Sequence, residues 1–270
     1  MQMIILTPVL IGLFVGSLMG LTGAGGGIIS VPLLIFGLGL PLNQAAPIAL
    51  TSVAISAGIG AYLGFRSKIL RYKAAALMSV TGLILSPLGL WLAHLTPEQP
   101  LVIGFGLLLI WISLRMLIQA HQAKKADFPK PTVRPCCELH AVTGKFIWNR
   151  KCLSALIFTG GVTGFLSGLL GVGGGFILVP ALKKLTDLPM QSIVATTLGV
   201  IAVVSTGNAL MASATGNLNW TIGVPFICGS IMGLGVGRKL IEKIHTTHLQ
   251  QIFAMLTLII AINLIYKTVL

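Results

Sequence analysis

Long apolar stretches alternate with short polar loops along most of the chain. A helix needs about 20 apolar residues to cross a bilayer, and several stretches approach that length. The predicted spans are residues 45–65, 74–92, 101–118, 191–212, 220–237 and 249–266. Residues 119–151, between the third and fourth spans, are polar and contain several prolines, so we interpret them as a linker. This pattern predicts an all-α polytopic membrane protein.

Two further apolar stretches, residues 4–38 and 152–182, are interrupted by glycine-rich segments. Residues 20–32 read GLTGAGGGIISVP, and residues 168–180 read GLLGVGGGFILVP. Each glycine costs a helix roughly 1 kcal/mol relative to alanine, so both helices should stop and restart there. Inside a bilayer such a break is tolerated where the freed backbone groups face protein or a wet cavity. We therefore predict two broken-helix hairpins.

The second half of the chain repeats the first. Gly168 follows Gly20 by 148 residues, and the same offset relates Phe253 to Phe105 without a gap between. One unit therefore occurs twice, and each unit is a broken-helix hairpin followed by three transmembrane helices. The predicted repeats are residues 1–118 and 152–270.

The composition excludes a soluble domain. Hydrophobic residues make up 55% of the chain and charged residues 9%, whereas soluble domains carry about 25% charged residues. The formal net charge is +13. The basic residues cluster in short loops between spans, which is the pattern that orients membrane proteins. We therefore predict the lipid bilayer as a partner, and no nucleic acid.

The basic loops predict the orientation of the chain, because short cytoplasmic loops hold Lys and Arg. If each hairpin enters and leaves on one side, all the basic loops fall in the cytoplasm. They are residues 66–73, 119–151, 183–187 and 238–248, while the loops without Lys or Arg are residues 94–100 and 213–219. Each half then crosses an odd number of times, so the repeats are inverted. Two full crossings by each hairpin would keep the loops on the same sides, and this alternative stays open.

The paired G-x-G-G-G breaks, each followed by Val-Pro, resemble the TauE/SafE family, also described as sulfite exporters. The Leu-Pro turns at residues 40–41 and 188–189 add to the resemblance, as do the stretches at residues 49–52 and 195–198. The resemblance covers roughly residues 9–264. It implies transport of small anions, often sulfite, thiosulfate or organosulfonates, across the bacterial inner membrane.

Helix N-termini offer free N–H groups and a positive dipole end, both of which suit an anion. We predict that the first broken helix restarts at Gly27 or Ile28, and the second at Gly175 or Phe176. Their amides could cradle one anion near the centre, with nearby hydroxyls as further donors. The candidate substrate-binding residues are Thr22, Gly23, Gly25, Gly26, Gly27, Thr51, Ser52, Gly171, Gly173, Gly174, Gly175, Thr196 and Thr197. The alternative is that these glycines serve close helix packing.

The acidic residues are few, and we place all of them in loops. They are Glu98, Asp127, Glu138, Asp187 and Glu242. The membrane interior then holds no carboxylate for a proton relay or a sodium site. An inside-negative potential drives an anion outward by about 2.3 kcal/mol per charge per 100 mV, so we predict voltage-assisted export.

No nucleophile–base set or metal cluster lies within the spans, so we predict no enzyme activity, no catalytic residues, no metal and no cofactor. Cys136, Cys137 and His140 lack the usual spacing of zinc ligands, and we interpret the cysteines as reduced cytoplasmic thiols outside any disulfide framework. Asn208 and Asn263 either line a path or form interhelical hydrogen bonds.

The sequence as a whole favours a multi-pass permease of the bacterial inner membrane. The resemblance implies that the permease exports a small anion, a sulfur oxyanion or organosulfonate such as sulfite, and we expect the anion to bind at the midplane between the two breaks. An anion channel, an importer and a non-transporting scaffold subunit are the alternatives, and a homo-oligomer stays open.

Overall fold

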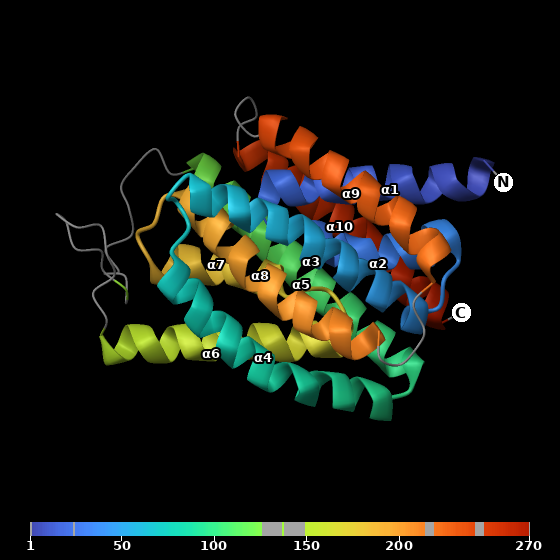
Figure 1. Ribbon diagram of the computed structural model, residues 1–270, viewed down its shortest axis with the longest axis horizontal. Coiled ribbons are helices and arrows are strands. Elements are labelled where there is room, and N and C mark those ends of the chain that lie inside the picture. The colour runs from blue at the N-terminus through green and yellow to red at the C-terminus, as the bar shows by residue number, and fades with distance from the viewer. Residues whose placement is uncertain are drawn as a thin grey trace.

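The computed structural model describes residues 2–23, 25–125, 137, 149–213, 219–240 and 246–269. Nearly all of these residues are helical, as predicted for an all-α protein. The helices are α1 Gln2–Thr22, α2 Gly25–Leu38, α3 Leu42–Arg66, α4 Tyr72–Leu95, α5 Glu98–Lys125, α6 Arg150–Leu170, α7 Gly175–Leu185, α8 Met190–Ser213, α9 Trp220–Leu240 and α10 Thr246–Val269. Most of the helices run roughly along the long axis of the molecule, and both ends of the chain lie at the same end of that axis (Figure 1).

Within the described residues, six helical segments are long and apolar enough to cross a membrane. They are Leu42–Arg66, Tyr72–Ala93, Gln99–Ile118, Arg150–Leu170, Met190–Ala212 and Trp220–Lys239. The chain is therefore a multi-pass membrane protein. Arg150–Leu170 belongs to the second predicted hairpin, so the first arm of that hairpin alone has the length of a span.

The α2 helix folds back along α1, and α7 folds back along α6. Near its start, α2 contacts α1 at Gly26, which packs on Met19; near its end, Gly37 contacts Ile11. These contacts require the two helices to run antiparallel, as in a hairpin. In Figure 1, α2 lies in the right half of the molecule and α7 in the left half.

Each hairpin is joined to the other half of the chain by one pair of parallel helices, α1 with α9 and α6 with α4. Along the α1–α9 pair, Gly12 packs on Phe226 and Gly20 packs on Leu234. The α6–α4 pair is the equivalent pair in the repeat: Gly164 packs on Gly82, as Gly16 packs on Ser230, and the equivalent residues are 148 positions apart. Small residues let helix backbones approach closely in membranes, which explains the run of glycines along α1 and α6.

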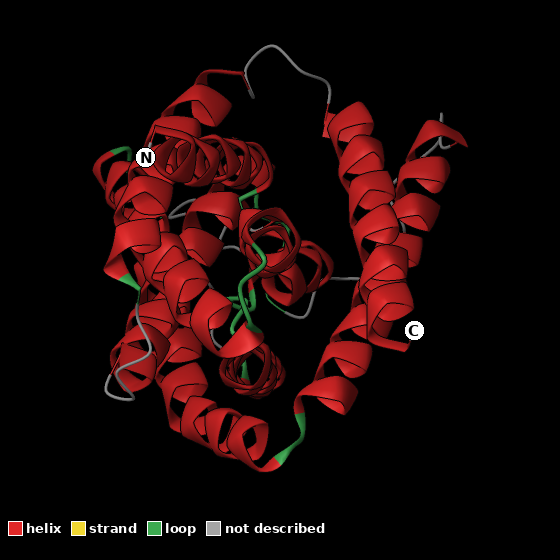
Figure 2. Cartoon of the chain, turned by 90° about the vertical axis from the view of Figure 1, so that its right-hand side faces the viewer, coloured by secondary structure: helices red, strands yellow, loops and turns green. Residues whose placement is uncertain are grey.

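Two antiparallel pairs bring equivalent helices of the two halves together. In the α3–α8 pair, Gly60 packs on Leu198, and Gly64 packs on Ala195. In the α5–α10 pair, Ser113 of α5 shares a 2.6 Å hydrogen bond with Thr257. Figure 2 looks along the long axis of Figure 1 and shows the C-terminal end of the chain at one side of the molecule. Helices that occupy the same place in the two sequence halves therefore run in opposite directions side by side.

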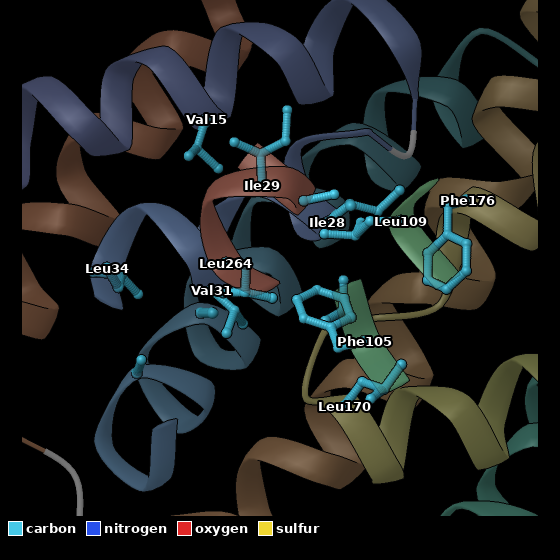
Figure 3. Close-up of a cluster of buried hydrophobic side chains, with 14 of the residues drawn as sticks. Val15, Ile28, Ile29, Val31, Leu34, Phe105, Leu109, Leu170, Phe176 and Leu264 are labelled. Atoms are coloured by element: carbon cyan, nitrogen blue, oxygen red, sulfur yellow. The ribbon is translucent and has the colours of Figure 1, made fainter. Parts of the chain in front are cut away.

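A hydrophobic core surrounds α2 and draws on both halves. Its α2 members, Ile28, Ile29, Val31 and Leu34, are all at most 1% exposed. Side chains from α1, α5, α6, α7 and α10 meet them, and Figure 3 shows this convergence. These partners include Val15, Phe105, Leu109, Leu170, Phe176 and Leu264. Residues 26–32 of α2 are all buried, which explains why this part of the helix is apolar around its whole circumference.

Basic residues gather at one end of the bundle. The backbone N–H of Arg71, in the α3–α4 connection, donates to Thr196 Oγ1 near the start of α8 at 3.1 Å. The guanidinium of Arg238, near the end of α9, donates to the carbonyl of Gly60 at 2.9 Å. Loops that are far apart in the sequence thus share one end, as the charge pattern predicts.

The prediction of reduced thiols is wrong for two cysteines. A disulfide joins Cys137 to Cys152 at the start of α6, and both residues are fully buried. The N–H of Cys137 also donates to the carbonyl of Leu185 at 3.0 Å. The linker residue Cys137 thereby ties the start of α6 to the end of α7, a long-range contact that spacing alone does not reveal. Cys228 is free, and Cys136 and His140 lie outside the described residues.

Candidate functional site

Both helix breaks begin with a glycine in the left-handed conformation. After α1, Gly23 has φ +75°, and its N–H donates to the carbonyl of Met19 at 2.8 Å. After α6, Gly171 has φ +69°, and its N–H donates to the carbonyl of Ser167 at 2.9 Å. This is a common helix C-terminal geometry that favours glycine. The two halves thus stop their first helix in the same way.

The helices then restart at different distances from the stop. The α7 helix begins at Gly175 as predicted, but α2 begins at Gly25, so the prediction of Gly27 or Ile28 is wrong. The glycines counted as helix breakers form the first turn of α2. Gly26 packs against α1, where a Cβ would lie only 2.5 Å from the carbonyl oxygen of Val15. Close approach of the two hairpin arms therefore requires glycine inside this helix.

The two breaks meet against one residue of α3. A Cβ built on Gly27 would lie 2.6 Å from the carbonyl oxygen of Val172, in the opposite break. The side chain of Val53 lies 3.6 Å from that Cβ position. It also lies 3.1 Å from a Cβ built on Gly173, in the second break. The structure therefore brings the start of α2 and the start of α7 together at the middle of α3.

Each break also packs on the helix that follows the opposite hairpin. A Cβ on Gly23 would lie 2.5 Å from Val194 of α8, and one on Gly171 would lie 2.6 Å from Ala46 of α3. Val194 and Ala46 are themselves equivalent positions in the two halves. Gly23 and Gly171, the first residues of the two breaks, therefore pack on equivalent positions of the two halves.

Two helix N-termini are thus directed into the protein interior. The first N–H groups of any helix lack acceptors within it. In α2 these belong to residues 25–27, and in α7 to residues 175 and 176, because the N–H of Ile177 donates to the carbonyl of Gly174 at 3.3 Å. Neither first turn contains an acidic residue. The local field at both helix starts is therefore positive, which suits an anion.

The predicted hydroxyl donors are mostly engaged with their own helices. Thr22, Thr51 and Thr197 donate to the backbone carbonyls of Leu18, Pro47 and Val194, at 2.7–2.9 Å. A hydroxyl that donates to a carbonyl has no second proton for a ligand. These side chains can serve an anion only after they rotate away from the backbone.

The other two predicted hydroxyls link helices. Thr196 donates to the carbonyl of Ser192 at 2.6 Å while accepting from the α3–α4 connection. Ser52 of α3 donates to Ser230 of α9 at 2.8 Å. Both residues are buried, and their observed contacts are structural.

Sequence reasoning missed Ser205. A Cβ on Gly173 would lie 3.0 Å from Ser205 Oγ, and this buried hydroxyl has no hydrogen-bond partner among the described residues. The signal was available, because Ser205 follows the predicted site residue Thr197 by eight positions, which places both on one face of a helix.

The two asparagines have different environments. Asn208 of α8 is 2% exposed; it accepts from Ser86 of α4 and donates to Ser167 of α6 at 2.9 Å. Asn263 of α10 is exposed. Of the two readings left open for Asn208, interhelical hydrogen bonding is the one observed.

A family comparison matches the amino-acid sequence of this chain to a known group of proteins. The family described as sulfite exporter TauE/SafE matches residues 9–264, which include both breaks and every helix pair described above. The chain belongs to the sulfite exporter TauE/SafE family. It is therefore a membrane transporter, in line with the helices that can span a bilayer.

Similar full-length proteins occur in distant organisms. A probable membrane transporter protein of Xylella fastidiosa is 28% identical over 95% of this chain and 93% of its own length. The probable membrane transporter protein YunE of Bacillus subtilis is 26% identical over 96% of both chains. A third, MJ0441 of Methanocaldococcus jannaschii, is 27% identical over 90% of both. No solved structure matches the chain.

Proposed function

We propose that this TauE/SafE protein exports a small anion, a sulfur oxyanion or organosulfonate such as sulfite, across the bacterial inner membrane. The anion binds at the midplane, where the two glycine breaks meet. The observation that carries the proposal is the contact of both breaks with Val53 and of Gly27 with the backbone of Val172. The starts of α2 and α7 lie together at a buried position beside Val53. A helix bundle that serves only a structural role does not need this arrangement.

The binding chemistry comes from the backbone. The first-turn amides of α2 and α7 donate to the oxyanion. No arginine or lysine whose side chain the structure describes is fully buried, and the two half-buried ones, Arg71 and Arg238, lie at the basic end of the bundle. The anion is then held by partial charges rather than by a full ion pair, so it can also leave.

The antiparallel pairing of α3 with α8 and of α5 with α10 supports an inverted repeat. In an inverted repeat, equivalent helices point to opposite sides of the membrane. The hairpin α1–α2 then enters from one side and α6–α7 from the other. Small movements of one half against the other would open the shared site to each side in turn.

The membrane potential supplies the driving force. The six candidate spans contain no Asp or Glu, so they offer no carboxylate for a coupling proton or sodium ion. An inside-negative potential of 100 mV favours exit of a monovalent anion by about 2.3 kcal/mol. Export therefore proceeds without a coupled cation.

The test is sulfite flux from proteoliposomes with an imposed potassium diffusion potential. We expect protein-dependent efflux that speeds up when the interior is negative and does not change when a proton gradient is added. Thiosulfate, sulfate and sulfoacetate tested in parallel define the substrate class. Efflux that ignores the potential but follows the proton gradient would contradict uniport, and no flux of any of these anions would contradict the proposed substrate class.

A further inference from the structure

Ser205 of α8 is fully buried, and its Oγ has no hydrogen-bond partner among the described residues. A Cβ built on Gly173 would lie 3.0 Å from the Ser205 Oγ, so the hydroxyl lies against the second break. Burying an unpaired hydroxyl is unfavourable, and native proteins rarely do so. The position therefore calls for a ligand that supplies the missing partner.

A neighbouring hydroxyl shows what a helical serine or threonine ordinarily does. Such side chains commonly donate to the carbonyl one turn earlier, and Thr206 donates to Ala202 in this way at 2.6 Å. Thr197, on the same face of α8 as Ser205, likewise donates to Val194. Ser205 makes no such bond, so its hydroxyl proton is free to point into the break.

We propose that Ser205 is a substrate-binding residue whose hydroxyl donates a hydrogen bond to the anion held at the start of α7. This assignment rests on the proposed function of the two breaks as an anion site. An oxyanion carries several acceptor oxygens, so it can accept from the α7 amides and from the Ser205 hydroxyl together. Hydrogen bonds to a charged acceptor are the strong ones, so an oxyanion is a suitable partner for this hydroxyl.

The assignment makes the site asymmetric. The position equivalent to Ser205 in the first half is Ala57, which is also fully buried. The first break therefore lacks this donor. The anion consequently binds nearer to the second break, α6–α7, than to the first.

Ser205 is distinguished from other buried serines by its position. Ser56 of α3 and Ser79 of α4 also lack partners among the described residues. Their chain neighbours Ala57 and Met78 belong to the same hydrophobic cluster as Ile201. No described contact places either hydroxyl at a break, so Ser205 alone carries the assignment.

The test compares wild-type protein with Ser205→Ala and with the control Ser113→Ala. Ser113 is equally buried but pairs with Thr257 in the α5–α10 interface. The readouts are thermal stabilisation by sodium sulfite in detergent and sulfite flux in proteoliposomes. For Ser205→Ala we expect the half-saturating sulfite concentration to rise about tenfold or more in both assays, the loss of one hydrogen bond to a charged group. The control should stay within about twofold of wild type, because its hydroxyl lies outside the site.

The melting temperature without sulfite separates a binding role from a structural one. Removing an unpaired buried hydroxyl relieves a penalty, so empty Ser205→Ala should be at least as stable as wild type. An unchanged sulfite response, or a less stable empty protein, would overturn the assignment while the wild-type response upholds the proposed function. If sulfite, thiosulfate and sulfate all fail to stabilise wild type, both the proposed function and the role of Ser205 are wrong.

Discussion

Asn208 links three helices through one buried amide. Its oxygen accepts from Ser86 of α4 and its nitrogen donates to Ser167 of α6, while the residue itself belongs to α8. Both serines are fully buried, so neither finds a substitute in water. This single side chain therefore fixes the register of the second hairpin against two spans.

We predict that Asn208→Ala lowers the free energy of unfolding by about 1–2 kcal/mol, since interhelical hydrogen bonds in membranes reach roughly that size and two serine hydroxyls lose their partner. Asn263→Ala is the matched control, because Asn263 is exposed on α10 and should show no loss. Urea or detergent-induced unfolding followed by circular dichroism measures both. Equal stability of the two variants would show that the buried network contributes nothing.

Residue types were predictable from the sequence, but their hydrogen-bond partners were not. Thr51 and Ser52 are adjacent and chemically alike, yet one bonds its own helix and the other bonds Ser230 of α9. Which way a hydroxyl points depends on the packing of the neighbouring helix. For the same reason Ser205 gained its role only once Gly173 was seen beside it.

At the scale of elements, the second hairpin is closed at its base. The Cys137–Cys152 disulfide holds the start of α6, and the N–H of Cys137 bonds the carbonyl of Leu185 at the end of α7. The two arms of the hairpin cannot separate at this end while the linker stays in place. These two bonds therefore link the arms of the hairpin at the end opposite to its tip, residues 171–174.

We predict that Cys152→Ser lowers the free energy of unfolding by about 3 kcal/mol, the chain-entropy value for a closed loop of some 15 residues. Cys228→Ser is the control, because Cys228 is free and exposed. Denaturant unfolding without reductant should separate the two variants, and added dithiothreitol should remove most of the difference between Cys152→Ser and wild type. A Cys152→Ser protein as stable as wild type in both conditions would show that the bond does not form.

The repeated elements were predictable because their pattern is local. The G-x-G-G-G segments located both helix stops, and the second restart at Gly175 was correct. The first restart was placed two residues too late because glycine was read as a helix breaker. Contact between Gly26 and α1 overrides this cost, and such a contact is invisible to a single-helix argument.

At the scale of the whole molecule, charge and cysteine chemistry favour different compartments for the same end. Basic loops favour the cytoplasm, whereas stable disulfides are typical of oxidising compartments. Arg71 and Arg238 both lie at the end where α8 begins. A direct measurement of orientation decides which signal prevails.

We predict that the charge signal prevails. Lys183→Cys should react with a membrane-impermeant maleimide only after permeabilisation, and Asn219→Cys should react in intact cells. Both positions are exposed at helix ends, and Cys136→Ser with Cys228→Ser removes the two cysteines outside the Cys137–Cys152 disulfide. The reverse labelling pattern would place the basic end outside, and equal labelling of both positions in intact cells would contradict the opposite placement of these loops.

The central claim is that an anion sits where the two breaks meet. Selenite is the selenium analogue of sulfite, and its anomalous scattering locates it in crystals of the protein. The account predicts a selenium peak beside Val53, between Gly27 and Gly173 and within hydrogen-bond reach of Ser205. A peak confined to the basic end of the bundle, or no peak from protein that transports selenite, would contradict it.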